Sequence, residues 1–256
     1  MKSPTLLEAT GVSKRFGGVL ALDDVSLDVG PAEAVGLVGP NGAGKTTFFN
    51  CLLGLLRPDS GRVTFNGQDL AHMSIHRRAR LGIGRTFQRV ELFAGLTVGE
   101  HLLIAERARS GRGGLLADMV GGGRPTVEEQ ERVAAMLDLV GLGGMAGLPV
   151  EALSLGHARL LELGRALITD PQLLLLDEPS SGLDRVEALA LADVLRSTQE
   201  ERHTAVLLVE HDLEMVHRVV SRLFVLDFGS VLASGAVDEV LGDDRVRHAY
   251  LGRGVA

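Results

Sequence analysis

Three short runs of apolar residues predict strands that are covered on both faces. The runs are AVGLV at 34–38, LLLL at 173–176 and AVLLV at 205–209, and a helical pattern follows each of them. Uninterrupted apolar runs of this length are typical of a parallel sheet with helices on both sides. The flanks of the chain therefore predict an α/β fold. The three helices are expected at about 44–55, 186–201 and 212–222.

The first thirty residues have a different pattern. The segments LLEATGVSKRF and VSLDV suggest short strands ahead of the first strand–helix unit. We expect a small antiparallel sheet there.

The middle of the chain is helical and rich in loops. Thr126 and Glu129 have the spacing of a capping box, and an apolar stripe of helical period follows them. A second helix is expected to start at Thr97, with Glu100 three residues later. Six glycines within residues 110–125 predict a mobile loop between the two helices.

Composition excludes several classes of protein. Of the 256 residues, 45% are hydrophobic and 23% are charged, which is ordinary for a globular domain and excludes disorder of the whole chain. Cys51 is the only cysteine, so a disulfide scaffold and a cysteine-rich zinc site are excluded. The net charge of −7 argues against non-specific binding of nucleic acid over the whole surface, though not against a local basic patch, and we expect no nucleic-acid partner. No window of 18 residues is apolar and uncharged, so we expect a soluble, cytoplasmic chain that reaches a membrane only through partners.

Residues 39–46, GPNGAGKT, match the phosphate-binding pattern G-x-x-x-x-G-K-[ST] at every fixed position. The glycines allow backbone N–H groups to point inward as an anion cradle, and the following helix adds partial positive charge. A chance match in a glycine-rich chain is the alternative, which the preceding strand and the following helix disfavour. Lys45 is expected at the β and γ phosphates and Thr46 at Mg²⁺. The expected nucleotide contacts are Gly39, Pro40, Asn41, Gly42, Ala43, Gly44, Lys45, Thr46 and Thr47.

The second apolar run ends in two carboxylates, Asp177 and Glu178. A buried parallel strand delivers Asp177 to the same sheet edge as the phosphate loop, where it can hold Mg²⁺. Glu178 can then act as a general base on an attacking water. The alternative is a strand that simply ends in two solvated acids.

The order of six motifs resembles the ATP-binding subunits of ABC transporters, over nearly the whole chain. That family combines a phosphate loop, a glutamine, an LSGGQ-like signature, the acidic strand end, a D-loop and a switch histidine. The corresponding residues here are 39–46, Gln88 in RTFQ, LSLGH at 153–157, Asp177 with Glu178, SGLD at 181–184 and His211 in VEHD.

The resemblance implies roles for further residues. Ser154 and Gly156 would contact the γ phosphate bound by an opposite subunit, although Leu155 and His157 depart from LSGGQ. Gln88 would complete the Mg²⁺ site and link it to the helical region.

The remaining roles have open alternatives. His211 would act near the γ phosphate, Asp184 at the subunit boundary, and Phe16 would stack on adenine. Without the resemblance, Ser154 is a helix cap, Asp184 an exposed turn acid and Phe16 a core residue of the small sheet.

The resemblance also implies an architecture. A RecA-like core over about 1–88 and 155–256 would carry the antiparallel β subdomain and an inserted helical subdomain at about 89–154, in a single ABC ATPase domain over 1–256. Two such chains would meet head to tail and trap two ATP molecules. The second chain would be a copy or a paralogue.

Three segments are similar to the branched-chain amino acid importer ATPases. They are KRFGGVLALDDVSL, GIGRTFQRVELFAGLTVGEHLL and LVEHDLEMVHRVVSRLFVLDFGSVLASG. The implied partners are two transmembrane permease subunits and, indirectly, an extracytoplasmic binding protein, with this chain peripheral on the inner face of the membrane. Urea, short amides or lipopolysaccharide are alternative cargoes. An ABC ATPase of DNA repair or translation, or a regulator without turnover, is disfavoured by the short insert, the single cysteine, Glu178 and His211.

Overall fold

A six-stranded sheet forms the centre of the protein. The structure is a computed structural model that describes residues 5–86, 91–111 and 124–251. Five strands are parallel, β10 is an antiparallel edge, and the order is β10-β9-β3-β8-β7-β6. The three predicted strands are confirmed. The bounds are β3 (Ala34–Val38), β6 (Ile83–Arg85), β7 (Leu173–Asp177), β8 (Ala205–Val209), β9 (Arg222–Asp227) and β10 (Ser230–Ala236).

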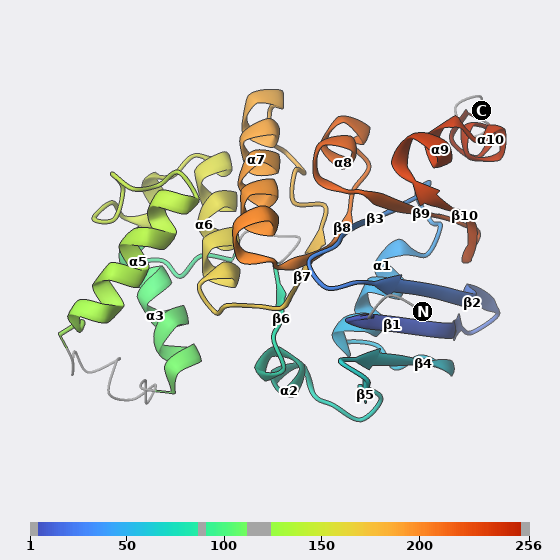
Figure 1. The fold of residues 1–256 in the computed structure, drawn as a ribbon, viewed down its shortest axis with the longest axis horizontal. Coiled ribbons are helices and arrows are strands. Elements are labelled where there is room, and N and C mark those ends of the chain that lie inside the picture. Colours follow the sequence, from blue (N-terminus) through green and yellow to red (C-terminus); the bar gives the residue numbers. More distant parts are fainter. Residues whose placement is uncertain (1–4, 87–90, 112–123, 252–256) are drawn as a thin grey trace.

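Both faces of this sheet are covered, which explains its apolar strands. Alternate residues enter two separate cores: Leu175 and Leu207 pack with α1 (Lys45–Leu53) and the antiparallel sheet, whereas Leu176 and Leu208 pack with helices on the other face. Figure 1 shows these helices above the sheet and the antiparallel strands below it. The helices are α6 (Leu155–Leu167), α7 (Arg185–Arg202) and α8 (Leu213–Val219), followed by α9 (Val237–Gly242) and α10 (Asp244–Leu251).

The expected antiparallel sheet is present. Its first strand matches the predicted segment LLEATGVSKRF to within one residue, whereas its second strand begins six residues before the predicted VSLDV. The sheet has the order β2-β1-β4-β5, and the pairing of β1 with β2 shifts register after Ala9. Gly11, with a φ of 64°, lies at this irregularity, so the strand continues through a bulge. The bounds are β1 (Leu7–Phe16), β2 (Val19–Val29), β4 (Ser60–Phe65) and β5 (Gln68–Asp69).

A group of helices lies at the far end of the sheet, beside α6 in Figure 1. Both predicted capping boxes are confirmed, with Thr97 capping α3 (Val98–Ser110) and Thr126 capping α5 (Val127–Leu139). The predicted loop at 110–125 falls largely outside the described residues. The 3₁₀ turn (Val150–Ala152) belongs to the same part, whereas α2 (Ile75–Arg80) lies apart from it, next to β6.

The helix expected at 212–222 is wrong at its end. It stops at Val219, because Val220 is already extended and leads into β9. None of the helices in the described ranges combines the length and apolar character needed to cross a membrane.

Candidate functional site

Strand register brings the predicted motifs to one edge of the sheet. Leu37 of β3 and Asp177 of β7 both pair with Val209 of β8. The next residues of all three strands therefore leave the sheet side by side at its carboxyl edge. Ligands of open α/β sheets bind at this edge.

The phosphate loop has a backbone that only glycine permits. Gly39 and Gly44 have φ angles of 149° and 102°. A Cβ on Gly39 would lie 2.1 Å from the carbonyl oxygen of Leu226, and one on Gly44 would lie 2.6 Å from that of Ala21. The loop is thus pressed against neighbouring backbone and leads directly into α1.

The ammonium group of Lys45 is buried against the phosphate loop. Its Nζ donates to the carbonyl oxygens of Gly39 at 2.6 Å and Pro40 at 3.1 Å. Asn41, Gly42 and Thr46 are exposed, Gly44 and Thr47 are half-buried, and Ala43 is buried. The ammonium group of Lys45 therefore lies next to loop residues that a ligand can reach.

Asp177 is the last residue of β7, and Glu178 follows the strand. Burial, Glu178 and Glu210 raise the pKa of Asp177 to about 6, and Lys45 acts in the opposite direction. Glu178 is half-buried with a φ of 48°, and its backbone N–H donates to the carbonyl of Val209 at 2.8 Å. A non-glycine residue in this left-handed region costs about 1 kcal/mol or more. The turn that aims Glu178 is therefore held by the pairing of β7 with β8.

Glu210 is a residue of this edge that the sequence prediction missed. It follows β8 and is fully buried. Its Oε1 accepts from the backbone N–H of Ser180 at 2.9 Å and from the Ser180 hydroxyl at 2.6 Å. Its Oε2 accepts from the N–H of His211 at 3.0 Å. The signal was a carboxylate directly after an apolar run, as at Asp177.

His211 and Phe16 are both accessible. The His211 side chain is 59% exposed, and its Nδ1 lies 3.6 Å from Glu210 Oε2. Phe16 is 46% exposed, so the alternative that it is a core residue is wrong. Lys14 Nζ lies 5.6 Å from its ring centroid. Gln88 lies outside the described residues.

The signature residues lie at the start of α6. Ser154 caps this helix by accepting from the N–H of His157 at 3.2 Å, as its structural alternative predicts. A Cβ on Gly156 would lie 2.5 Å from Glu187 Oε1. Asp184 caps α7 and forms a capping box with Glu187, so the description of it as only an exposed turn acid is incomplete. In the described part of the chain, the Ser154 side chain forms no hydrogen bond with the phosphate loop.

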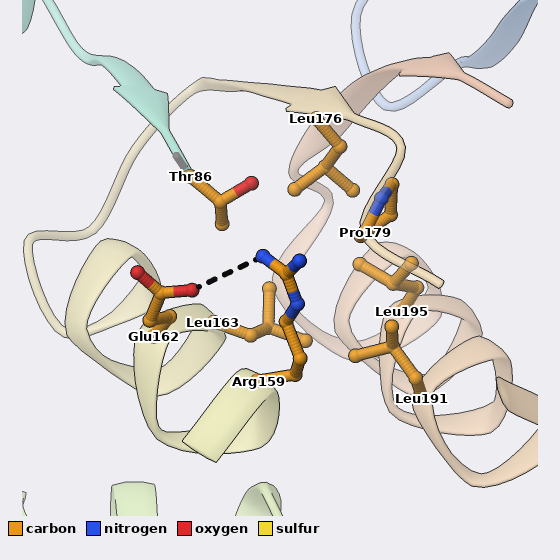
Figure 2. Close-up of a pocket in the computed structure, with 8 residues that line it drawn as sticks. All are labelled: Thr86, Arg159, Glu162, Leu163, Leu176, Pro179, Leu191 and Leu195. Carbon is orange, nitrogen blue, oxygen red and sulfur yellow. Dashed lines mark hydrogen bonds and ion pairs between the residues drawn. The ribbon is translucent and has the colours of Figure 1, made fainter. Parts of the chain in front are cut away.

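A stripe of charged residues continues along α6 and contacts the segment that follows β6. Glu162 Oε1 accepts from the N–H of Glu91 at 2.9 Å, and Arg165 donates to the Glu91 carbonyl at 2.9 Å. Figure 2 shows Arg159 pointing toward Glu162 and Thr86 across a cavity of about 10 Å³. This volume is close to the minimum for one water molecule.

A larger groove lies on the outer side of the same segment. It has a volume of about 860 Å³ and lies between α2, β6, α3 and α6. Leu92 and the exposed Phe93 supply apolar surface. Its arginines include Arg80, Arg85, Arg109 and Arg165.

Comparisons with known proteins agree with this geometry. The family model described as "ABC transporter" matches residues 22–181. The branched-chain amino acid transport ATP-binding protein LivG of Escherichia coli K12 is 38% identical over 253 residues, which cover 98% of this chain and 99% of LivG. BraF of Pseudomonas aeruginosa PAO1, described in the same words, is 36% identical over 98% of this chain and 99% of its own. The ADP conformation of MJ1267, an ATP-binding cassette of an ABC transporter, has a TM-score of 0.85 at 31% identity, covering 98% of this chain and all of that one.

Proposed function

The chain belongs to the ABC transporter family, and we propose that it is the ATP-hydrolysing subunit of an importer for branched-chain or related amino acids. The observation that carries the proposal is the alignment of the phosphate loop, Asp177 and Glu178 on one sheet edge. The near full-length similarity to LivG and BraF supports the cargo. LptB of a lipopolysaccharide export system is also 34% identical, so lipid export is the alternative.

The phosphate loop would bind the phosphates of ATP through its backbone N–H groups and Lys45. The ammonium group would exchange its bonds to Gly39 and Pro40 for phosphate oxygens, which are stronger, charge-assisted partners. Phe16 is accessible for stacking on adenine.

The residues at the sheet edge fit Mg²⁺. A buried carboxyl whose pKa is raised to about 6 by burial and two neighbouring acids lies in surplus negative charge, which a divalent cation compensates. Thr46 and Asp177 would hold the ion together with Gln88, and its charge would offset that of the phosphates.

Glu178 would accept the proton of the attacking water, with His211 on the adjacent strand end. Ser154 and Gly156 would serve the nucleotide of a second ATPase chain, a copy or a paralogue, in a head-to-tail pair. The exposure of Ser154 at a helix start supports this role, because its own cap leaves the hydroxyl accessible. Asp184, at the start of α7 near this surface, would lie at the subunit boundary.

The groove beside Phe93 would receive a cytoplasmic helix of a permease subunit. Glu91 lines this groove, and its backbone N–H donates to Glu162 on α6. Because α6 begins at the signature residues, this hydrogen bond would connect the groove with them. Two permease subunits would place the chain at the inner face of the membrane, and an extracytoplasmic binding protein would select the cargo. The division into a core and a helical subdomain at 89–154 is part of this proposal.

The experiment is ATP hydrolysis by the purified chain, alone and with its permeases, for the wild type, Glu178→Gln and the matched control Glu200→Gln. We expect Glu178→Gln to lower kcat by about 10²–10⁴-fold, the usual contribution of a general base. ATP should still bind, and the closed pair should accumulate in size-exclusion chromatography with Mg²⁺. Glu200→Gln changes an exposed carboxylate of α7 and should leave kcat unchanged. A wild-type rate in Glu178→Gln would show that another group is the base.

A further inference from the structure

The carboxylate of Glu210 joins two loops that come from different strands. One loop follows β7 and carries Glu178 and Ser180, and the other follows β8 and carries His211. Ser180 donates two hydrogen bonds to Oε1, and the backbone N–H groups of His211 and Asp212 donate to Oε2 at 3.0 and 3.5 Å, so each oxygen belongs to one loop. The side chain is 0% exposed.

The buried carboxylate of Glu210 is satisfied by hydrogen bonds from the two loops and not by a fixed cation. In the described part of the chain, Glu210 forms no ion pair with a lysine or arginine, and the nearest ionisable side chain that could carry a positive charge is that of His211, at 3.6 Å. A buried carboxylate held only by neutral donors is expensive unless several hydrogen bonds satisfy it. Its charge also acts on Asp177, whose pKa it helps to raise.

We propose that Glu210 is a positioning residue that holds Glu178 and His211 at a fixed separation during ATP hydrolysis. The inference rests on the proposed function, because it assigns both residues to one reaction. A carboxylate accepts on both oxygens, whereas an amide has one accepting oxygen and one donating nitrogen. The glutamine of Glu210→Gln therefore fits the space but can keep only one of the two loops bonded.

The test compares kcat and ATP affinity in the full-length chain for four variants. Misplacement of a catalytic group by about 1 Å can cost about 100-fold in rate, so we expect Glu210→Gln to lower kcat by about 10–100-fold. Nucleotide affinity should change by less than about threefold, because none of the hydrogen bonds and ion pairs of Glu210 among the described residues involves the phosphate loop. A loss confined to kcat reports on the transition state. Ser180→Ala removes one of the four hydrogen bonds to Glu210 and should lower kcat by a smaller factor.

Glu106→Gln is the matched control, because Glu106 is another buried carboxylate but lies on α3. It should lower the melting temperature and leave kcat intact at temperatures where it is folded. The proposal is overturned if kcat of Glu210→Gln stays within about twofold of the wild type, or if kcat and ATP affinity fall together. If Glu210→Gln does not fold, Ser180→Ala decides, and an unchanged kcat there overturns the proposal.

Glu178→Gln is measured in the same series. If it retains the wild-type rate, the proposed base is wrong. If it is inactive while Glu210→Gln is not, only the positioning role fails.

Discussion

Buried carboxylates occupy two regions of this protein, and they are satisfied in opposite ways. At the carboxyl edge of the sheet, neither Asp177 nor Glu210 forms an ion pair with a lysine or arginine within the described ranges. In the helical part, Glu106 pairs with Arg109 at 2.6 Å and with Arg132 at 3.0 Å. Glu129 likewise pairs with Arg107 at 3.0 Å.

The pKa values follow this difference. Burial and two neighbouring acids raise the pKa of Asp177 to about 6. Burial acts in the same direction on Glu106, but hydrogen bonds from Arg109 and Arg132 outweigh it and lower the pKa of this carboxyl. Glu162, on α6 between the two regions, keeps a pKa raised by burial despite Arg159 and Arg165.

The comparison separates acids that arginines neutralise from acids that lie in surplus negative charge. The helical part neutralises its own charge, so its acids stabilise the free chain. The sheet edge keeps a negative charge that destabilises the free chain and that a bound cation would offset. A local loss of stability at a functional site is a common exchange of stability for activity.

The largest effect is expected from Asp177→Asn. Loss of the proposed metal ligand should weaken Mg²⁺-dependent hydrolysis by at least about 100-fold, since even outer partners of a metal site are worth about 10–100-fold. The melting temperature of the free chain should stay equal or rise, because a crowded buried charge is removed. ATPase assays over a Mg²⁺ series, together with thermal melts in EDTA, check both parts. A lower melting temperature would contradict the comparison.

Glu106→Gln should lower the stability of the chain and leave its activity unchanged, the opposite of Asp177→Asn. The free energy of unfolding should fall by about 2–3 kcal/mol, below the ~3–5 kcal/mol for breaking a fully buried ion pair, because Arg109 and Arg132 are about one-third exposed. The kcat for ATP should be unchanged at 20 °C or below. Urea unfolding and an ATPase assay of the same sample measure the two quantities. Loss of activity without loss of stability would show that Glu106 takes part in ATP hydrolysis.

Local patterns were enough to predict much of the fold. The apolar runs of β3 and β8 gave strand bounds that match the structure, because strands covered on both faces contain no polar residue. Thr97 and Thr126 marked two helix starts, because a capping box lies within four consecutive residues. The phosphate loop was equally readable, since its chemistry is local.

Residues whose partners are distant in sequence were not predictable. Glu210 bonds to Ser180, 30 residues away, and only the pairing of β7 with β8 brings them together. Arg78 is another example: its buried guanidinium donates to the carbonyls of Cys51, Leu52 and Leu70, and so stabilises the end of α1. A single arginine in the run HRRAR carries no local sign of that role.

The smallest effect is a dependence on pH that distinguishes the two acids. The folded-state pKa of Asp177 is about 6, above its ordinary value of 3.8, so between these values the folded chain binds a proton that the unfolded chain does not. The contribution of Asp177 to the stability of the metal-free chain then falls as pH rises through that window. Asp177→Asn lacks this dependence, so its stability relative to wild type should be highest at pH 7 and shrink at pH 5. The change between these pH values is about 1 kcal/mol, because about one unit of the window is crossed.

Glu106 provides the internal control for this measurement. The pKa of Glu106 is lowered, so its contribution to the stability of the folded chain is fully present at pH values above the ordinary glutamate pKa. This contribution is lost only as the pH falls below that value. The stability difference between Glu106→Gln and wild type should therefore be the same at pH 7 and pH 5. Urea unfolding in EDTA at both pH values, for the wild type and the two variants, measures all four differences. A constant difference for Asp177→Asn would mean that its carboxyl is already compensated in the free chain, and the contrast between the two regions would then fail.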